Sequence, residues 1–142
     1  MINKIISFIA ITIFTSNAYS QENPVKIGVV GLTHTHVHWI FNSNQHKKFD
    51  IVGIVEPNKE LAKRYADQYK FSMDLVFDTL EELIASNSPE AVTAFGTIYD
   101  HLKIVETCAP LGIHVMVEKP LAVSLKHAKR MKQLAEKYKI HL

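Results

Sequence analysis

Short apolar runs rich in β-branched residues alternate with amphipathic helical stretches after residue 24, and this alternation constrains the fold most strongly. The run "KIGVVG" is continuously apolar and ends in glycine, as expected for a strand buried on both faces. Strands are expected within 26–31, 50–57, 73–86, 88–97 and 113–120, and helices within 35–46, 58–70, 73–86, 99–112 and 124–139. This order predicts an α/β fold, a doubly wound, Rossmann-like parallel sheet with helices on both faces.

The ends of these elements show where a ligand should bind. Asn58 and Ser124 are expected to cap two of the helices, because their side chains can accept a free helix amide. Residues 140–142 are interpreted as the start of a sixth strand. A doubly wound sheet binds its ligand beyond the carboxyl ends of the strands. Candidate site residues are therefore sought directly after each strand.

Composition excludes several classes of function. The chain has 142 residues, 47% of them hydrophobic, which predicts one soluble domain. A formal net charge of +2 without a concentrated basic run argues against a nucleic-acid partner. The single cysteine, Cys108, excludes an intramolecular disulfide and a Cys-rich zinc site. Because Cys108 lies in an apolar helical run, it is interpreted as a small buried hydrophobe.

Residues 1–20 have the pattern of a signal peptide. Lys4 precedes an apolar run, and the small residues Ala18 and Ser20 predict cleavage before Gln21. The apolar run is shorter than the roughly 20 residues that span a bilayer, so a membrane anchor is the less favoured alternative. We therefore expect an exported protein, periplasmic or extracellular, with no stable membrane span after cleavage. The folded domain is expected to cover residues 21–142 and to be incomplete at its C-terminal end.

The segment "GLTHTH" after the first strand is a modified version of a nucleotide loop. The usual pattern is G-x-G-x-x-G, and only its first glycine is present, as Gly31. A helix that starts here would present free amides to an anion, and Thr33 and Thr35 would add hydroxyl groups. His34 is expected to border the same pocket. Gly31, Thr33, His34 and Thr35 are therefore candidate cofactor contacts.

Glu56 follows the second strand and lies 56 − 36 = 20 residues beyond the end of this loop. An acidic residue at that distance is placed to bind the adenosine ribose diol and would repel a 2′-phosphate. The residue spacing thus favours NAD over NADP, although the nearby Lys59 weakens the preference. The alternative is that Glu56 only begins a solvated turn before Pro57.

The histidines of the loop raise the question of a metal. His34 and His38 are four residues apart on one helix face, and His34 and His36 form an H-x-H pair like that of barrel-type metal-dependent hydrolases. A barrel needs about 250 residues, and the sequence shows no partner cluster of histidine or aspartate at metal spacing. No metal is therefore expected, and a metal hydrolase ranks behind the other functions.

The second half of the chain carries a family motif. A strand leads to a turn with His101, a helix follows, and the block "APLGIHVMVEKPLA" ends in Glu118, Lys119 and Pro120. This arrangement resembles the Gfo/Idh/MocA oxidoreductases, in which a helix ending A-L-x-x-G-K-H-V precedes a strand ending E-K-P-L-A. Together with "KIGVVG" and Glu56, the likeness covers nearly everything after the signal peptide.

The resemblance implies roles for these residues. Lys119 matches the catalytic lysine beside the nicotinamide and the substrate hydroxyl, where a compact cation would stabilise a developing alkoxide. Glu118 and Pro120 are implied to shape that turn, with Glu118 near the nicotinamide ribose. Thr97 and His101 are implied to lie in a turn against the cofactor.

The resemblance also implies a function. Members pair this domain with a larger C-terminal domain that holds the substrate pocket, which is absent from this chain, so it is a fragment, a truncated product or a stand-alone module. We expect the nucleotide-binding domain of an exported NAD(P)-dependent oxidoreductase that acts on a sugar or polyol, with NAD preferred and a homo-oligomer at full length. The alternatives are an NAD-dependent glycosidase of the same family and a non-catalytic binding module that has lost the cofactor.

Overall fold

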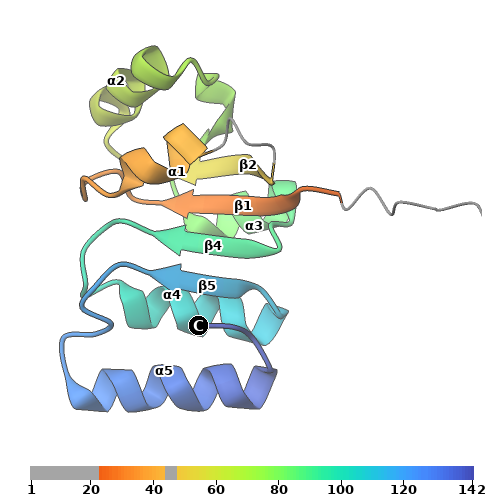
Figure 1. Ribbon diagram of the computed structural model, residues 1–142, viewed down its shortest axis with the longest axis vertical. Coiled ribbons are helices and arrows are strands. Elements are labelled where there is room, and N and C mark those ends of the chain that lie inside the picture. Colours follow the sequence, from red (N-terminus) through yellow and green to blue (C-terminus); the bar gives the residue numbers. More distant parts are fainter. Residues whose placement is uncertain (1–22, 44–47) are drawn as a thin grey trace, which may run out of the picture.

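The computed structural model describes residues 23–43 and 48–142 as one parallel sheet covered by helices on both faces (Figure 1). The strands are β1 (Val25–Val30), β2 (Phe49–Val55), β3 (Val76–Phe77), β4 (Ala91–Ala94) and β5 (His114–Val117), in the spatial order β3-β2-β1-β4-β5. The helices are α1 (Val37–Ser43), α2 (Lys59–Tyr69), α3 (Leu80–Asn87), α4 (His101–Cys108) and α5 (Leu125–Tyr138), with short 3₁₀ turns at η2 (Met73–Leu75) and η3 (Ala109–Leu111). Every strand pair is parallel, so the predicted doubly wound fold is confirmed.

Most of the predicted element ends are found. The Asn58 side chain accepts the Leu61 amide at the start of α2, and the Ser124 side chain accepts the His127 amide at the start of α5. The predicted helix over 35–46 begins at Val37, and its last residues lie outside the described parts of the chain. The predicted signal peptide also lies outside them.

The predicted sixth strand is wrong. The described chain end lies beside β5 (Figure 1), but the only backbone bond between these residues and β5 runs from the Val115 amide to the His141 carbonyl, at 3.0 Å. A single ladder bond in the last three residues is too little to form a strand.

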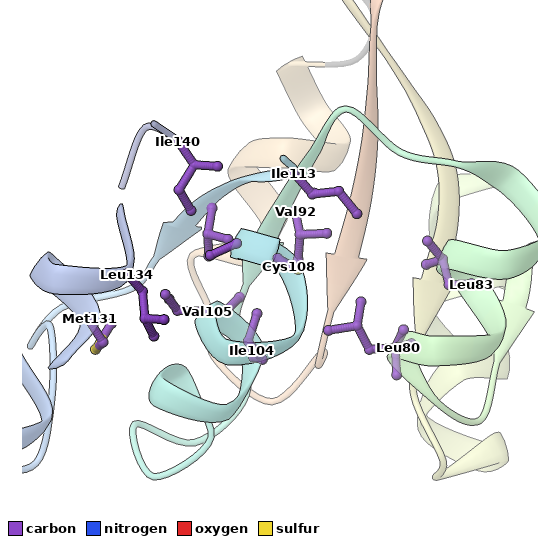
Figure 2. Close-up of a cluster of buried hydrophobic side chains, with 14 residues drawn as sticks. Leu80, Leu83, Val92, Ile104, Val105, Cys108, Ile113, Met131, Leu134 and Ile140 are labelled. Carbon is purple, nitrogen blue, oxygen red and sulfur yellow. The ribbon is translucent and has the colours of Figure 1, made fainter. Parts of the chain in front are cut away.

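The two faces of the sheet are buried by different side chains. On one face, β4, β5, α3, α4 and α5 form an aliphatic cluster around Val92, Val105 and Cys108 (Figure 2). Cys108 is fully buried, and burial raises the pKa of its thiol to about 12, so the interpretation of Cys108 as a small hydrophobe is confirmed. On the other face, α1 and α2 cover Val29 and Ile54 with an aromatic-rich cluster. Within the described residues, no helix combines the length and apolarity needed to cross a bilayer.

Candidate functional site

The order in which the chain adds strands to the sheet reverses between β1 and β4. At this point two glycines allow the loops after β1 and β4 to approach closely. Gly31 directly follows β1 with φ +79°, a conformation that favours glycine. A Cβ at Gly31 would lie 2.6 Å from both the backbone nitrogen and the Cα of Gly96, which follows β4 after Phe95. Any larger residue at position 31 would therefore displace the β4 loop.

A cavity of about 400 Å³ lies at this crossing, between the carboxyl ends of the strands and the first turns of α3 and α4. Its volume is within the range of ligand pockets, about 300–1,000 Å³. Of the predicted site residues, it is lined by Gly31, Thr33, Glu56 and Thr97. The residues predicted after β1, β2 and β4 therefore lie together at one cavity.

Glu56 is buried at the end of β2, with only 5% of its surface exposed. Its Oε2 accepts the Leu32 amide at 3.0 Å, and its Oε1 accepts the Asn58 amide at 3.0 Å. The interpretation of Glu56 as part of a solvated turn is therefore wrong. Each carboxylate oxygen can accept a second hydrogen bond, so Glu56 both fixes the loop after β1 and keeps acceptor capacity beside the cavity.

The backbone amides of the loop after β1 are mostly bound by the protein itself. Those of Gly31 and His34 donate to the carbonyls of Val55 and Phe95, both at 2.9 Å. The His36 amide donates to Nδ1 of His34 at 3.2 Å, and the Thr33 hydroxyl donates to the Phe95 carbonyl at 3.3 Å. The predicted row of free helix amides is therefore corrected, because the loop turns on itself before α1 begins.

His36, the histidine in the third glycine position, contacts the residue that follows the edge strand β5. Nδ1 of His36 lies 2.8 Å from Oε2 of Glu118, which follows β5, and the two side chains are 26% and 13% exposed. The His36 ring stacks on Trp39, with centroids 3.9 Å apart, and meets the His34 ring edge-on at 4.6 Å. His34, His36 and Glu118 thereby form one cluster, although the sequence showed no partner for the histidine pair.

The environment of Glu118 favours its charged form. Burial raises the pKa of Glu118, but the hydrogen bonds from His36 and from the Lys119 amide, together with the charge of the histidines, outweigh burial and lower it. The Lys119 amide donates to Oε1 of Glu118 at 3.0 Å. Both carboxylate oxygens are thus engaged by residues of this chain.

His101 is buried, with 2% of its surface exposed, at the start of α4. Nδ1 of His101 lies 3.1 Å from the carbonyl of Leu121, in the segment that follows the E-K-P motif. Nε2 has no partner among the described residues. His101 does not line the cavity, and its ring contacts the turn after β5 from within, so its contact with the cofactor stays a prediction.

The remaining predicted residues are exposed at the same edge of the sheet. The Thr97 hydroxyl donates to Oδ2 of Asp100 at 2.7 Å, at the mouth of the cavity. Thr35, Lys119 and Pro120 are exposed and do not line it. The structure thus joins Gly31 and Glu56 in one cavity and places Lys119 outside it, beside the His36–Glu118 pair.

Sequence reasoning missed several residues of the cavity. Asp78 lies between β3 and α3, Gly96 follows β4, and Lys103 lies in the first turn of α4. Gly96 lies near the end of the segment 88–97 predicted to hold a strand, which could have identified it, whereas nothing in the local sequence marks Asp78 or Lys103.

A comparison with protein families gives one match over most of the chain. The model of the Gfo/Idh/MocA group, described as an oxidoreductase family with an NAD-binding Rossmann fold, matches residues 25–142. An oxidoreductase of Salmonella typhimurium, YceM, is 28% identical over 119 residues, which cover 83% of this chain and 37% of that protein. The yeast protein YMR315W of Saccharomyces cerevisiae is 25% identical over 122 residues, covering 80% of this chain and 33% of its own length.

Solved structures share the fold. An NADPH-dependent oxidoreductase from Desulfitobacterium hafniense has a TM-score of 0.70 and 26% identity, with 84% of this chain and 33% of that chain covered. The WlbA dehydrogenase from Chromobacterium violaceum, solved with NADH and UDP-GlcNAcA, has a TM-score of 0.75 and 19% identity, with 86% and 35% covered. The chain therefore spans about a third of the length of the proteins that it matches.

Proposed function

This chain belongs to the Gfo/Idh/MocA oxidoreductase family, and from that premise we propose that it is the coenzyme-binding part of an exported, NAD-dependent oxidoreductase that acts on a sugar or polyol. The observation that carries the proposal is the cavity at the β1/β4 crossing, with the buried Glu56 carboxylate in its wall. A parallel sheet binds a dinucleotide at this topological position.

The residues around the cavity fit an adenosine group. The Cβ position of Gly96 is open, with no other atom closer than 4.0 Å, so a ligand can approach the backbone there. Glu56 would accept the ribose hydroxyl groups with its remaining lone pairs, and Thr97 lies at the mouth of the cavity. These contacts need no free helix amides, which the loop after β1 does not offer in a row.

The charges near Glu56 support a preference for NAD over NADP. The Glu56 carboxylate would repel a 2′-phosphate. Lys59, which could attract that phosphate, forms an ion pair with Asp78, which lies just before α3. Since its charge is already balanced, Lys59 weakens the preference less than the sequence alone indicates.

Lys119 is proposed as the catalytic residue. Bound nicotinamide would supply the hydride acceptor or donor, and the exposed Lys119 ammonium at the end of β5 would stabilise negative charge on the substrate oxygen. His101 supports this turn from inside by binding the Leu121 carbonyl. The substrate class is supported by the WlbA dehydrogenase, whose structure holds UDP-GlcNAcA, and export by the pattern of residues 1–20.

One observation favours a second function, a binding module without coenzyme. Most amides of the loop after β1 are bound by acceptors of this chain, and the His36–Glu118 pair joins the loop to the end of β5. Such a loop is stable without a pyrophosphate. The two functions differ in whether the purified chain responds to a dinucleotide.

Thermal unfolding with each coenzyme tests the proposal. We expect NAD to raise the melting temperature more than NADP does, because only NAD gains from Glu56. Glu56→Gln should lose most of the NAD effect, whereas Glu60→Gln, an exposed change in the first turn of α2, should keep it. No response of the unaltered chain to either coenzyme would reject the oxidoreductase proposal in favour of the binding module.

A further inference from the structure

We propose that His34, His36 and Glu118 form a binding site for one divalent transition metal ion of the Zn²⁺ type, outside the cavity that contains Glu56. Each residue offers one ligand atom, and these atoms all lie within 4.8 Å of one another. The site joins the loop after β1 to the end of β5, and it goes beyond the proposed function.

The distances are compatible with coordination after small side-chain movements. Zinc binds histidine nitrogen and carboxylate oxygen at about 2.0–2.2 Å, so neighbouring ligand atoms of a tetrahedral site are about 3.3 Å apart. His36 and Glu118 are already closer than this, at 2.8 Å, and share a hydrogen bond that an ion would replace. All three side chains are half-buried, which leaves them room to turn toward a common centre.

The donor set selects the class of metal. Imidazole ligands suit zinc, copper and nickel, whereas Mg²⁺ and Ca²⁺ require oxygen ligands. Two histidines and one glutamate leave a fourth position of a tetrahedral site open for water or another ligand. The site is therefore expected to discriminate strongly against Mg²⁺.

The surroundings orient the ligands. Trp39 stacks on the His36 ring with an interplanar angle of 15°, and the Lys119 amide binds the Glu118 oxygen that does not face His36. Contacts that fix the orientation of metal ligands in this way raise metal affinity. A randomly exposed histidine pair would not have such support.

The site also accounts for the unusual loop sequence. His36 occupies the third glycine position of the nucleotide pattern, and His34 lies between the second and third. The substitution that weakens the nucleotide pattern is the same one that supplies a ligand opposite Glu118. A metal would pin the loop to β5 more firmly than the hydrogen bond alone.

The test uses the fluorescence of Trp39, which is the single tryptophan of the chain and stacks on a proposed ligand. Titration of the purified chain with Zn²⁺ or Co²⁺, without nucleotide, should change its emission saturably with one ion per chain. Mg²⁺ should cause no change. Co²⁺ should also give the visible absorption of a four-coordinate site.

Variants assign the response to the three residues. Glu118→Gln keeps the shape of the side chain and should weaken Zn²⁺ binding at least about tenfold, and His34→Ala should do the same. His127→Ala, a half-buried histidine of α5 that lies outside the cluster, is the matched control and should bind as the unaltered chain does. Circular dichroism of each variant shows whether it is folded. If His34→Ala does not fold, the near-isosteric Glu118→Gln still tests the proposal.

Unchanged Zn²⁺ affinity in the folded Glu118→Gln protein would overturn the proposal, as would the absence of saturable binding by the unaltered chain. Because no coenzyme is present, this result does not depend on the NAD experiment. A chain that binds zinc and ignores NAD would retain the metal site and lose the proposed function.

Discussion

The loop after β1 meets the neighbouring strands β2 and β4 in one way and the more distant strand β5, beyond β4, in another. Toward β2 and β4 it approaches through Gly31 and Gly96, and the open space beside them is the cavity with Glu56 in its wall. Toward β5 the loop extends the side chain of His36, which pairs with Glu118 at the end of that strand. One side keeps the backbone accessible to a ligand, and the other replaces that access with a side-chain bridge.

This difference shows which parts of a nucleotide site can change independently. The first glycine is required by the backbone crossing, because a Cβ there would overlap Gly96. The later glycine positions only need to satisfy or expose amides, and here the amide of His36 at the third position is satisfied by Nδ1 of His34. The first position is therefore fixed by the fold, and the later ones are free to take on other chemistry.

Replacement of Gly31 should disrupt the close contact between the loops beside the cavity and have the largest effect on stability. Gly31→Ala adds a Cβ that lies 2.6 Å from the Gly96 backbone in a left-handed conformation, so we expect a loss of about 2–5 kcal/mol in unfolding free energy. Gly112→Ala is the control, because its φ is +74° with nothing within 4 Å of the new Cβ. Its cost should be about 1–2 kcal/mol, from the backbone conformation alone. Equal losses in urea unfolding would contradict the close-crossing account.

Replacement of His101 should loosen the β5 side with an intermediate effect. His101→Leu removes the bond to the Leu121 carbonyl from a buried position, and we expect a loss of about 1–2 kcal/mol in unfolding free energy. His127→Leu is the control, because its ring is half-buried in α5 and makes no hydrogen bond among the described residues, and it should change the free energy by less than about 0.5 kcal/mol. If the two variants unfold at the same urea concentration, His101 does not anchor the turn.

Removal of the charge of Asp78 tests the role of Lys59 in coenzyme choice, and we expect it to have the smallest effect of the three changes. Asp78→Asn frees Lys59 from its ion pair, so NADP should gain on NAD by about two- to fivefold in relative affinity. Asp67→Asn, which releases Lys63 on the exposed surface of α2, is the control and should leave the ratio unchanged. Titration of each variant with both reduced coenzymes measures the ratio, and a preference unchanged in Asp78→Asn would remove Lys59 from the explanation.

The fold was predictable because its signals are local. Continuous apolar runs, the caps Asn58 and Ser124 and the alternation with helices each depend on neighbouring residues. The predicted sixth strand failed because strand formation depends on pairing, and residues 140–142 gain a single bond to β5. A pattern of side chains alone does not report the number of ladder bonds.

The site was predictable only where a strand end determines it. Gly31 and Glu56 follow their strands directly, Thr97 comes three residues after β4, and all three line one cavity. The burial of His101 depends on how α4 packs against the segment after β5, which its own sequence does not reveal. The His36–Glu118 pair joins residues 82 positions apart, so no local spacing could have supplied the third member of the histidine cluster.

The most direct test of the central claim is an NMR titration of the ¹⁵N-labelled chain with NADH. The account predicts amide shifts that saturate and cluster at Gly31, Glu56, Gly96 and Thr97, around the cavity. The opposite end of the sheet, at Ser88 and Gly112, should remain unchanged. Shifts confined to that opposite end, or no shifts at millimolar NADH, would contradict the assignment of the cavity to the coenzyme.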